Sequence, residues 1–236
     1  IPFAYTAEGV ALNQLRQGIY PPESAYVANP YREMIGAAMR AAVCGTIAPG
    51  NPKLAAELAW KDGSISHHNN GILTEIFNAV IVSMAYVEKD IRVILDKACD
   101  MIPKDSEFYS VITFARKACE TSATYREACE KCEEKYKEYN WVHAYPNMAF
   151  EIVAMHFAGN DFEKAMTILM MAGQDNDCTG GPIGHAYGTL LGKEAIGDKF
   201  ILPLQDQLDT YVRTMESQTI TSLSEKTTEA ILKYNK

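Results

Sequence analysis

The sequence lacks long apolar runs, dense cysteines and clustered basic residues. No stretch approaches the roughly 20 apolar residues needed to cross a bilayer, and no cleavable signal pattern opens the chain, so we predict no membrane partner. The 236 residues carry 22 basic and 30 acidic side chains, for a formal net charge of −8. Affinity for nucleic acid comes largely from clustered Lys and Arg, so this balance predicts no nucleic-acid partner.

Cysteines are few and irregularly spaced. The six do not have the density of a disulfide framework, which predicts a reducing compartment and a cytoplasmic protein. Cys129 and Cys132 form a CxxC without a second CxxC or a paired His motif, inside the charged run 126–137. This context favours one exposed helix face over a metal or redox site.

The amino end also lacks something, because the chain begins at Ile1 rather than Met. Pro2, Phe3 and Tyr5 have the character of interior residues, so we expect the natural start to lie upstream. If a helical layer is missing there, the surface it covered should be apolar and the chain should self-associate.

Helical periodicity dominates, and alternating strand patterns are hard to find. Apolar residues recur at i, i+3, i+4, i+7 and i+8 from Ile35, which predicts a helix over 30–45. Asn51 can cap a following helix, and Pro52 suits its first position. The run 72–85 is apolar nearly all round, which predicts a central core helix. Further helices are predicted at 53–62, 90–101, 106–139, 148–158, 162–172 and 182–191, with looser ones after Pro203.

These patterns predict an all-α fold. At this length the chain should bury about 70% of the surface that it exposes when unfolded, so it needs no disulfide or metal for stability. No internal repeat, flexible linker or low-complexity tract divides it. We therefore predict a single compact domain of packed, non-repeating helices over residues 1–236.

A polar stretch at 173–181 carries two carboxylates, Asp175 and Asp177. On a regular helix, side chains two residues apart point about 200° away from each other. In a turn they can converge on a hard cation such as Mg²⁺ or Ca²⁺. The pattern does not favour an EF-hand, because its twelfth position would be Ala186 rather than Glu, and Pro182 interrupts the loop. The alternative is that the two aspartates only cap the following helix.

A second polar stretch, 62–71, contains His67 and His68. Adjacent histidines point in different directions and cannot clamp one metal ion. A single imidazole there can hydrogen-bond a sugar or phosphate oxygen of a ligand, or simply satisfy a helix end. His185 lies about one helical turn beyond the acidic stretch and is a further candidate for the same cavity. Motifs of serine hydrolases, P-loop proteins, zincins and Rossmann folds are absent.

Several segments form a recognisable ordered set: 35–40, 49–52, 62–71, Asn147, 159–162 and 173–178, the last followed by Gly184, Gly188 and Gly192. In this order, the segments resemble the ADP-ribosylglycohydrolase family. The carboxy-terminal signature of that family is usually written G-G-D-T-D-T, followed by a glycine-rich helix.

The resemblance implies an all-α fold with a two-metal site, usually magnesium. Such a protein hydrolyses the glycosidic bond between ADP-ribose and a protein side chain or small acceptor. By position, Asp175 and Asp177 would bind metal, Gly36 and Arg40 would lie beside the bound ADP-ribose, and His67 would contact that ligand. The implied partners are therefore ADP-ribosylated proteins or small ADP-ribosyl compounds.

Three departures from the family pattern bear on these roles. Asn176 replaces the first Thr of the signature, and Cys178 replaces the second, whose hydroxyl usually helps to bind the metal. We count Cys178 as the third candidate ligand, although a thiol is a poor donor to a hard cation. The resemblance places the catalytic glutamate and the remaining metal ligands in an amino-terminal segment with an Asp-Asp-Thr-like motif, and this chain contains no Asp-Asp pair. We therefore expect the catalytic acid and these ligands upstream of Ile1 or in another chain. The alternatives to an enzyme are an inactive ADP-ribose-binding module and a structural protein of the same fold.

Overall fold

The computed structural model describes residues 4–234. Two three-residue strands, β1 (Gln207–Asp209) and β2 (Ser217–Thr219), form an antiparallel hairpin with Leu208 opposite Gln218. The other described elements are helical: α1 (Thr6–Arg16), α2 (Glu23–Tyr26), α3 (Gly36–Arg40), α4 (Ala42–Ile47), α5 (Pro52–Gly63), α6 (Asn70–Ala85), α7 (Ile91–Asp100), α8 (Glu107–Glu120), α9 (Tyr125–Tyr136), α10 (Ala144–Ala158), α11 (Phe162–Ala172), α12 (Asn176–Leu191), α13 (Lys193–Ile196), α14 (Asp198–Ile201), the 3₁₀ turn η1 (Leu202–Leu204) and α15 (Ile220–Tyr234).

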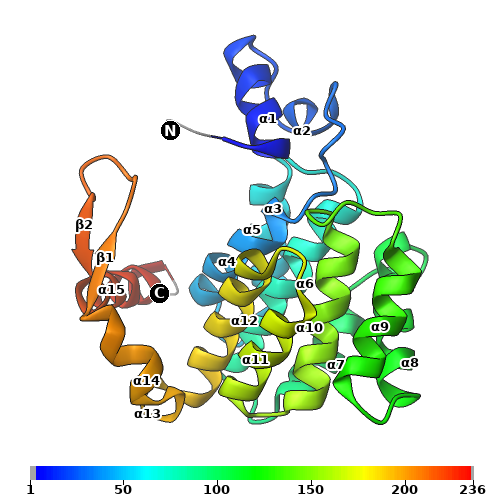
Figure 1. Ribbon diagram of the computed structural model, residues 1–236. Helices are drawn as coiled ribbons and strands as arrows, with labels where there is room; N and C mark the ends of the chain where they lie inside the picture. Colours follow the sequence, from blue (N-terminus) through cyan, green and yellow to red (C-terminus); the bar gives the residue numbers. More distant parts are fainter. Residues whose placement is uncertain (1–3, 235–236) are drawn as a thin grey trace.

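Helices α6 and α10 form the centre of one bundle (Figure 1). Helix α6 packs against α3, α4, α5, α7 and α12, and α10 packs against α7, α8, α9, α11 and α12. Both central helices are buried along most of their length, because nearly every face of each carries apolar side chains. The all-α prediction is confirmed, and so is the prediction of a core helix over 72–85.

Local capping explains where several helices begin. The Asn51 side chain accepts a hydrogen bond from the Leu54 amide, with Pro52 in the first turn, as expected. Asp161 caps α11 in the same way, through the Lys164 amide. These side chains satisfy amides that have no partner within the helix, and the predicted bounds at 53–62 and 162–172 lie within one residue of those observed.

Several predicted boundaries are wrong. The helix predicted at 30–45 begins later, at Gly36, because the residues before it form turns and the Ile35 amide donates to the Val142 carbonyl. It is also two helices, because the backbone hydrogen bonds around Ala41 span three residues instead of four. The single helix at 106–139 is α8 and α9, since Thr124 caps a new start. Helices α10 and α12 begin earlier than predicted, with Pro146 and Pro182 inside them.

The ends of the chain also depart from the predictions. Tyr5 is 74% exposed, so its expected interior position is wrong; Pro2 and Phe3 lie outside the described residues. The strands were not predicted, and they lie with α14 and α15 to one side of the bundle (Figure 1). Among the described residues, no helix is both long and apolar enough to cross a membrane.

The CxxC is only partly exposed. Cys132 is fully buried in the core and Cys129 is half-buried, which corrects the prediction that both lie on one exposed helix face. The spacing of three residues places them on neighbouring parts of α9, whose apolar side faces α8 and α10. All six cysteines of the chain are free thiols.

Candidate functional site

A cavity of about 820 Å³ lies at the end of the bundle beneath α1. Its walls come from α1, α3, the end of α5 and the loop that follows, the segment before α10, and the first turn of α12. The segments 35–40, 62–66 and 175–178 therefore meet in space, although they are far apart in the sequence. Its lining includes Glu8, Gly36, Arg40, Asp62, Ser66, Trp141, Asp175, Asp177 and Cys178.

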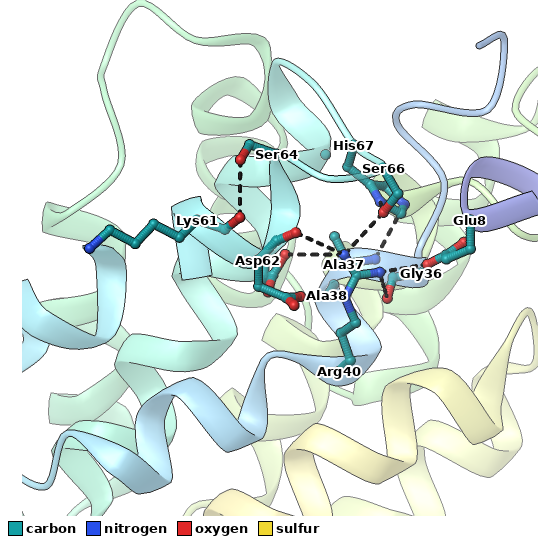
Figure 2. Close-up of polar contacts among 12 residues, drawn as sticks. Glu8, Gly36, Ala37, Ala38, Arg40, Lys61, Asp62, Ser64, Ser66 and His67 are labelled. Atoms are coloured by element: carbon teal, nitrogen blue, oxygen red, sulfur yellow. Dashed lines mark hydrogen bonds and ion pairs between the residues drawn. The ribbon is translucent and has the colours of Figure 1, made fainter. Parts of the chain in front are cut away.

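Arg40 is the centre of a polar network on one wall of this cavity (Figure 2). Its Nε donates to Asp62 Oδ2 at 2.5 Å, and its Nη1 donates to Glu8 Oε1 at 2.6 Å. Its Nη2 donates to Ser66 Oγ at 3.0 Å. A guanidinium group offers several donors in a fixed plane, so one side chain holds groups from α1, α5 and the following loop in place.

Gly36 makes room for this network. A Cβ atom at this position would lie 2.2 Å from Glu8 Oε1, so any other residue would displace the carboxylate from Arg40.

Burial raises the pKa of Glu8 above its usual value, even though the charge of Arg40 opposes the shift. For Asp62, burial acts to raise the pKa, but the hydrogen bond and charge of Arg40 outweigh it and hold that pKa below its usual value. Asp62 is thus an ionised partner of Arg40 at neutral pH, whereas burial makes ionisation of Glu8 harder than in water.

His67 lies behind this wall and is fully buried. The Ala37 amide donates to His67 Nε2 at 3.3 Å, and His67 Nδ1 lies 2.9 Å from Ser66 Oγ. Burial, together with the nearby charge of Arg40, lowers the pKa of His67 to about 3, so the ring is neutral. Ser66 Oγ therefore shares a hydrogen bond with His67 and accepts another from Arg40.

Glu75 is buried beneath the same network. Neither of its carboxyl oxygens has a hydrogen-bond donor, and Arg40 Nη2 is 4.0 Å from Oε2. Burial raises the pKa of Glu75 to about 10 against the opposing charge of Arg40, so the side chain is a neutral acid whose hydroxyl faces Asp62. Gly63 leaves the space for it, because a Cβ atom there would lie 2.6 Å from Oε2.

The acidic motif occupies the turn into α12. Gly173 and Gln174 have positive φ angles of 78° and 63°, which reverse the chain after α11. Asp175 then stands at the N-cap position and Asp177 in the first helical turn, so the two carboxylates are not constrained to opposite sides of one helix. Asp175 is only 6% exposed, and its carboxylate interacts with Cys178 in the first helical turn and with Asp177. Contact with the Cys178 amide is compatible with helix capping, and the carboxylate also lies close enough to Asp177 and Cys178 to share a cation with them.

Asn147 holds the motif from behind. Its Oδ1 accepts a hydrogen bond from the Asp175 amide at 3.0 Å. Its Nδ2 donates to the carbonyls of Trp141 and His143, each at 2.8 Å. All of its polar atoms are used, and the side chain is fully buried. Asn147 thus fixes Asp175 relative to the segment that carries Trp141.

The donor atoms of Asp175, Asp177 and Cys178 all lie within 4.8 Å of one another. Burial raises the pKa of Asp175, and the charge of Asp177 adds to this, because two like charges close together disfavour ionisation. Two carboxylates suit Mg²⁺, whereas a thiol does not. The donor set can thus hold a divalent cation, but it only partly fits magnesium.

Sequence reasoning named some of these residues and missed others. Gly36, Arg40, Asp175, Asp177 and Cys178 all line the cavity, whereas His67 lies behind Ser66. Glu8 and Glu75 were missed; Glu75 resembles one more residue of an apolar helix, and nothing near Glu8 signals a site. His185 lies elsewhere, with its Nε2 2.8 Å from Thr46 Oγ1, in a cavity of about 980 Å³ between α12 and the carboxy-terminal segment.

The fold and the site define an all-α protein with a ligand-sized cavity and a candidate metal centre at its edge. The family model described as ADP-ribosylglycohydrolase matches residues 3–234, nearly the whole chain. The chain therefore belongs to the ADP-ribosylglycohydrolase family, a family of glycohydrolases that act on ADP-ribose linkages. No curated protein and no solved structure matches the chain.

Proposed function

We propose that this protein hydrolyses the glycosidic bond that joins ADP-ribose to a protein side chain or a small acceptor. One observation carries the proposal: a single cavity brings the Asp175–Asp177 motif together with the Arg40 network. Its volume of about 820 Å³ falls within the range of roughly 300–1,000 Å³ that is usual for small-molecule sites. Family membership supplies the substrate class.

Each wall of the cavity has its own role in this proposal. Asp175 and Asp177 would hold the cation, for which the resemblance implies magnesium; when bound, such an ion fixes ribose hydroxyls and polarises water. Ser66 lines the cavity beside the ligand, and neutral His67 orients its hydroxyl. Since Glu8 and Asp62 already pair with Arg40, its guanidinium chiefly holds the wall beside the ligand.

The direct test is release of ADP-ribose from an ADP-ribosyl-arginine or ADP-ribosyl-serine substrate, with and without magnesium. We expect release by the wild-type protein and a loss of about tenfold or more in Asp175→Ala and Asp177→Ala. Asp105→Ala is the matched control, because Asp105 is exposed and does not line the cavity. No release by the wild type, or full activity in both cavity variants, would refute the proposal.

A second candidate is an ADP-ribose-binding module without hydrolysis. Its motivation is the donor set, since the single metal-binding group among residues 4–234 has three members, few for the two ions that the resemblance implies. Calorimetry with free ADP-ribose separates the two candidates: binding without turnover identifies the module. No binding at all would favour a structural protein of the same fold.

We propose the cytoplasm as the location, because six free thiols suit a reducing compartment. Self-association also stays a prediction. Tyr5, Met39, Ile65 and Trp141 are exposed apolar side chains around the cavity. Light scattering on the purified protein tests it, and a monodisperse monomer at high concentration would contradict it.

A further inference from the structure

Cys178 gives the candidate metal centre a donor that differs from its two neighbours in kind. Its Sγ lies 3.9 Å from Asp177 Oδ2, and both atoms belong to the group of three donors within 4.8 Å. Tetrahedral zinc, with bonds of about 2.3 Å to sulfur and 2.1 Å to oxygen, separates such a pair of donors by roughly 3.6 Å. The first turn of α12 therefore presents sulfur and oxygen at nearly the spacing of a shared zinc ion.

Asp175 is the buried member of the donor group. The residue is 94% buried, and its carboxylate lines the cavity. This carboxylate interacts with Asp177 and Cys178, the other two members of the group. Asn147 holds the Asp175 backbone, which fixes the carboxylate relative to Asp177 and Cys178. A preorganised carboxylate that faces two further donors is placed to share a cation with them.

Donor chemistry decides which cation is preferred. Magnesium takes oxygen ligands in near-ideal octahedral geometry and gains little from sulfur. Zinc accepts carboxylate oxygen and thiolate sulfur together, and catalytic zinc sites typically have three protein ligands and one open position. The Met39 thioether, 3.3 Å from Cys178 Sγ, adds a second polarisable sulfur beside the centre.

We infer that Asp175, Asp177 and Cys178 form a centre that binds a thiophilic divalent cation, of which zinc is the type, in preference to magnesium. The inference rests on the proposed function for the place of the metal in the cavity, but not for the reaction. Cys178 is the residue that determines the choice of metal, and a serine or threonine at this position restores an all-oxygen donor set.

The test is metal binding by the full chain after removal of metals with a chelator. Cadmium serves as the probe, because a cadmium–thiolate bond produces a charge-transfer absorbance in the ultraviolet. We expect this band in the wild type on addition of cadmium, and its loss in Cys178→Ser. The zinc affinity of Cys178→Ser should fall by about tenfold or more, while its magnesium affinity is unchanged or higher.

Cys129→Ser is the matched control, because Cys129 is the other half-buried cysteine and belongs to the CxxC. It should keep both the cadmium band and the zinc affinity. Absence of the band in the wild type would overturn the inference, as would equal zinc-to-magnesium preference in Cys178→Ser and wild type, or loss of the band in Cys129→Ser instead. A thiol that only packs on Met39 gives the first two of these results.

The outcomes also separate this inference from the proposed function. A Cys178-dependent cadmium band without any ADP-ribose release supports the metal centre and refutes the hydrolase. ADP-ribose release that needs magnesium, without such a band, supports the hydrolase and refutes the thiophilic centre. Circular dichroism of each variant confirms that the fold is retained before either result is interpreted.

Discussion

Substitution of Glu75 by Gln should stabilise this protein in a pH-dependent way. Burial raises the pKa of Glu75 to about 10 in the folded chain, from an ordinary value of 4.5. Between these two values the folded state keeps a proton that the unfolded state releases. The contribution of Glu75 to stability is therefore fully present below pH 4.5 and is lost as the pH rises towards 10.

The magnitude follows from the proton linkage. Each pH unit in this window lowers the free energy of unfolding by about 1.4 kcal/mol. Neutral pH lies about 2.5 units above the unfolded pKa, so the neutral acid lowers stability by about 3 kcal/mol at pH 7. Gln has the same shape and does not titrate, and its amide can donate to Asp62 as the carboxylic acid does. Glu75→Gln should gain nearly all of this difference.

Urea unfolding followed by circular dichroism at pH 5, 6, 7 and 8 measures the effect. The gain in Glu75→Gln should be small at pH 5 and grow by up to about 1.4 kcal/mol per unit. Glu57→Gln is the control, since Glu57 is exposed and its ion pair with Lys61 lies on the surface, where water screens it. If Glu75→Gln is less stable than wild type at every pH, Glu75 is instead an ionised partner of Arg40 and the reasoning is refuted.

Three further substitutions test the architecture of the site and core. Arg40→Lys keeps the charge, but a lysine cannot bind Asp62, Glu8 and Ser66 at once. Calorimetry should therefore show the affinity for ADP-ribose reduced by about tenfold, and an unchanged affinity would contradict the role of the network. Asn147→Ala leaves buried backbone groups without partners, and chemical denaturation should show a loss of about 2 kcal/mol or more together with weaker metal binding. Gly45→Ala places a Cβ atom 2.4 Å from the Ala79 carbonyl oxygen and should lower the stability by about 2 kcal/mol in a thermal-unfolding assay. Gly181→Ala is its control: the space around Gly181 is open, so this substitution should be neutral or slightly stabilising in that assay.

Much of the fold follows from short-range information. The apolar period of α6 and the caps at Asn51 and Asp161 involve residues within a turn or two of each other, so they are legible in the sequence. The start of α3 is not, because the Ile35 amide donates to the Val142 carbonyl, more than 100 residues away in the chain. Pro146 lies in the first turn of α10, where proline costs no helical hydrogen bond, whereas Pro182 lies inside α12, where it cannot donate to the Cys178 carbonyl. Neither proline marks the start of its helix.

The candidate site, like the fold, depends partly on local sequence and partly on tertiary packing. The sequence by itself determined the all-α class and the carboxylate motif at Asp175 and Asp177, because periodicity and adjacency are properties of the local chain. Only the tertiary structure decided which groups face that motif: Glu8 meets Arg40, and Asn147 holds Asp175. It also decided that Glu75 is a neutral acid and His67 a neutral base, since burial and nearby charges set protonation. Burial and through-space distance arise only when remote segments pack together.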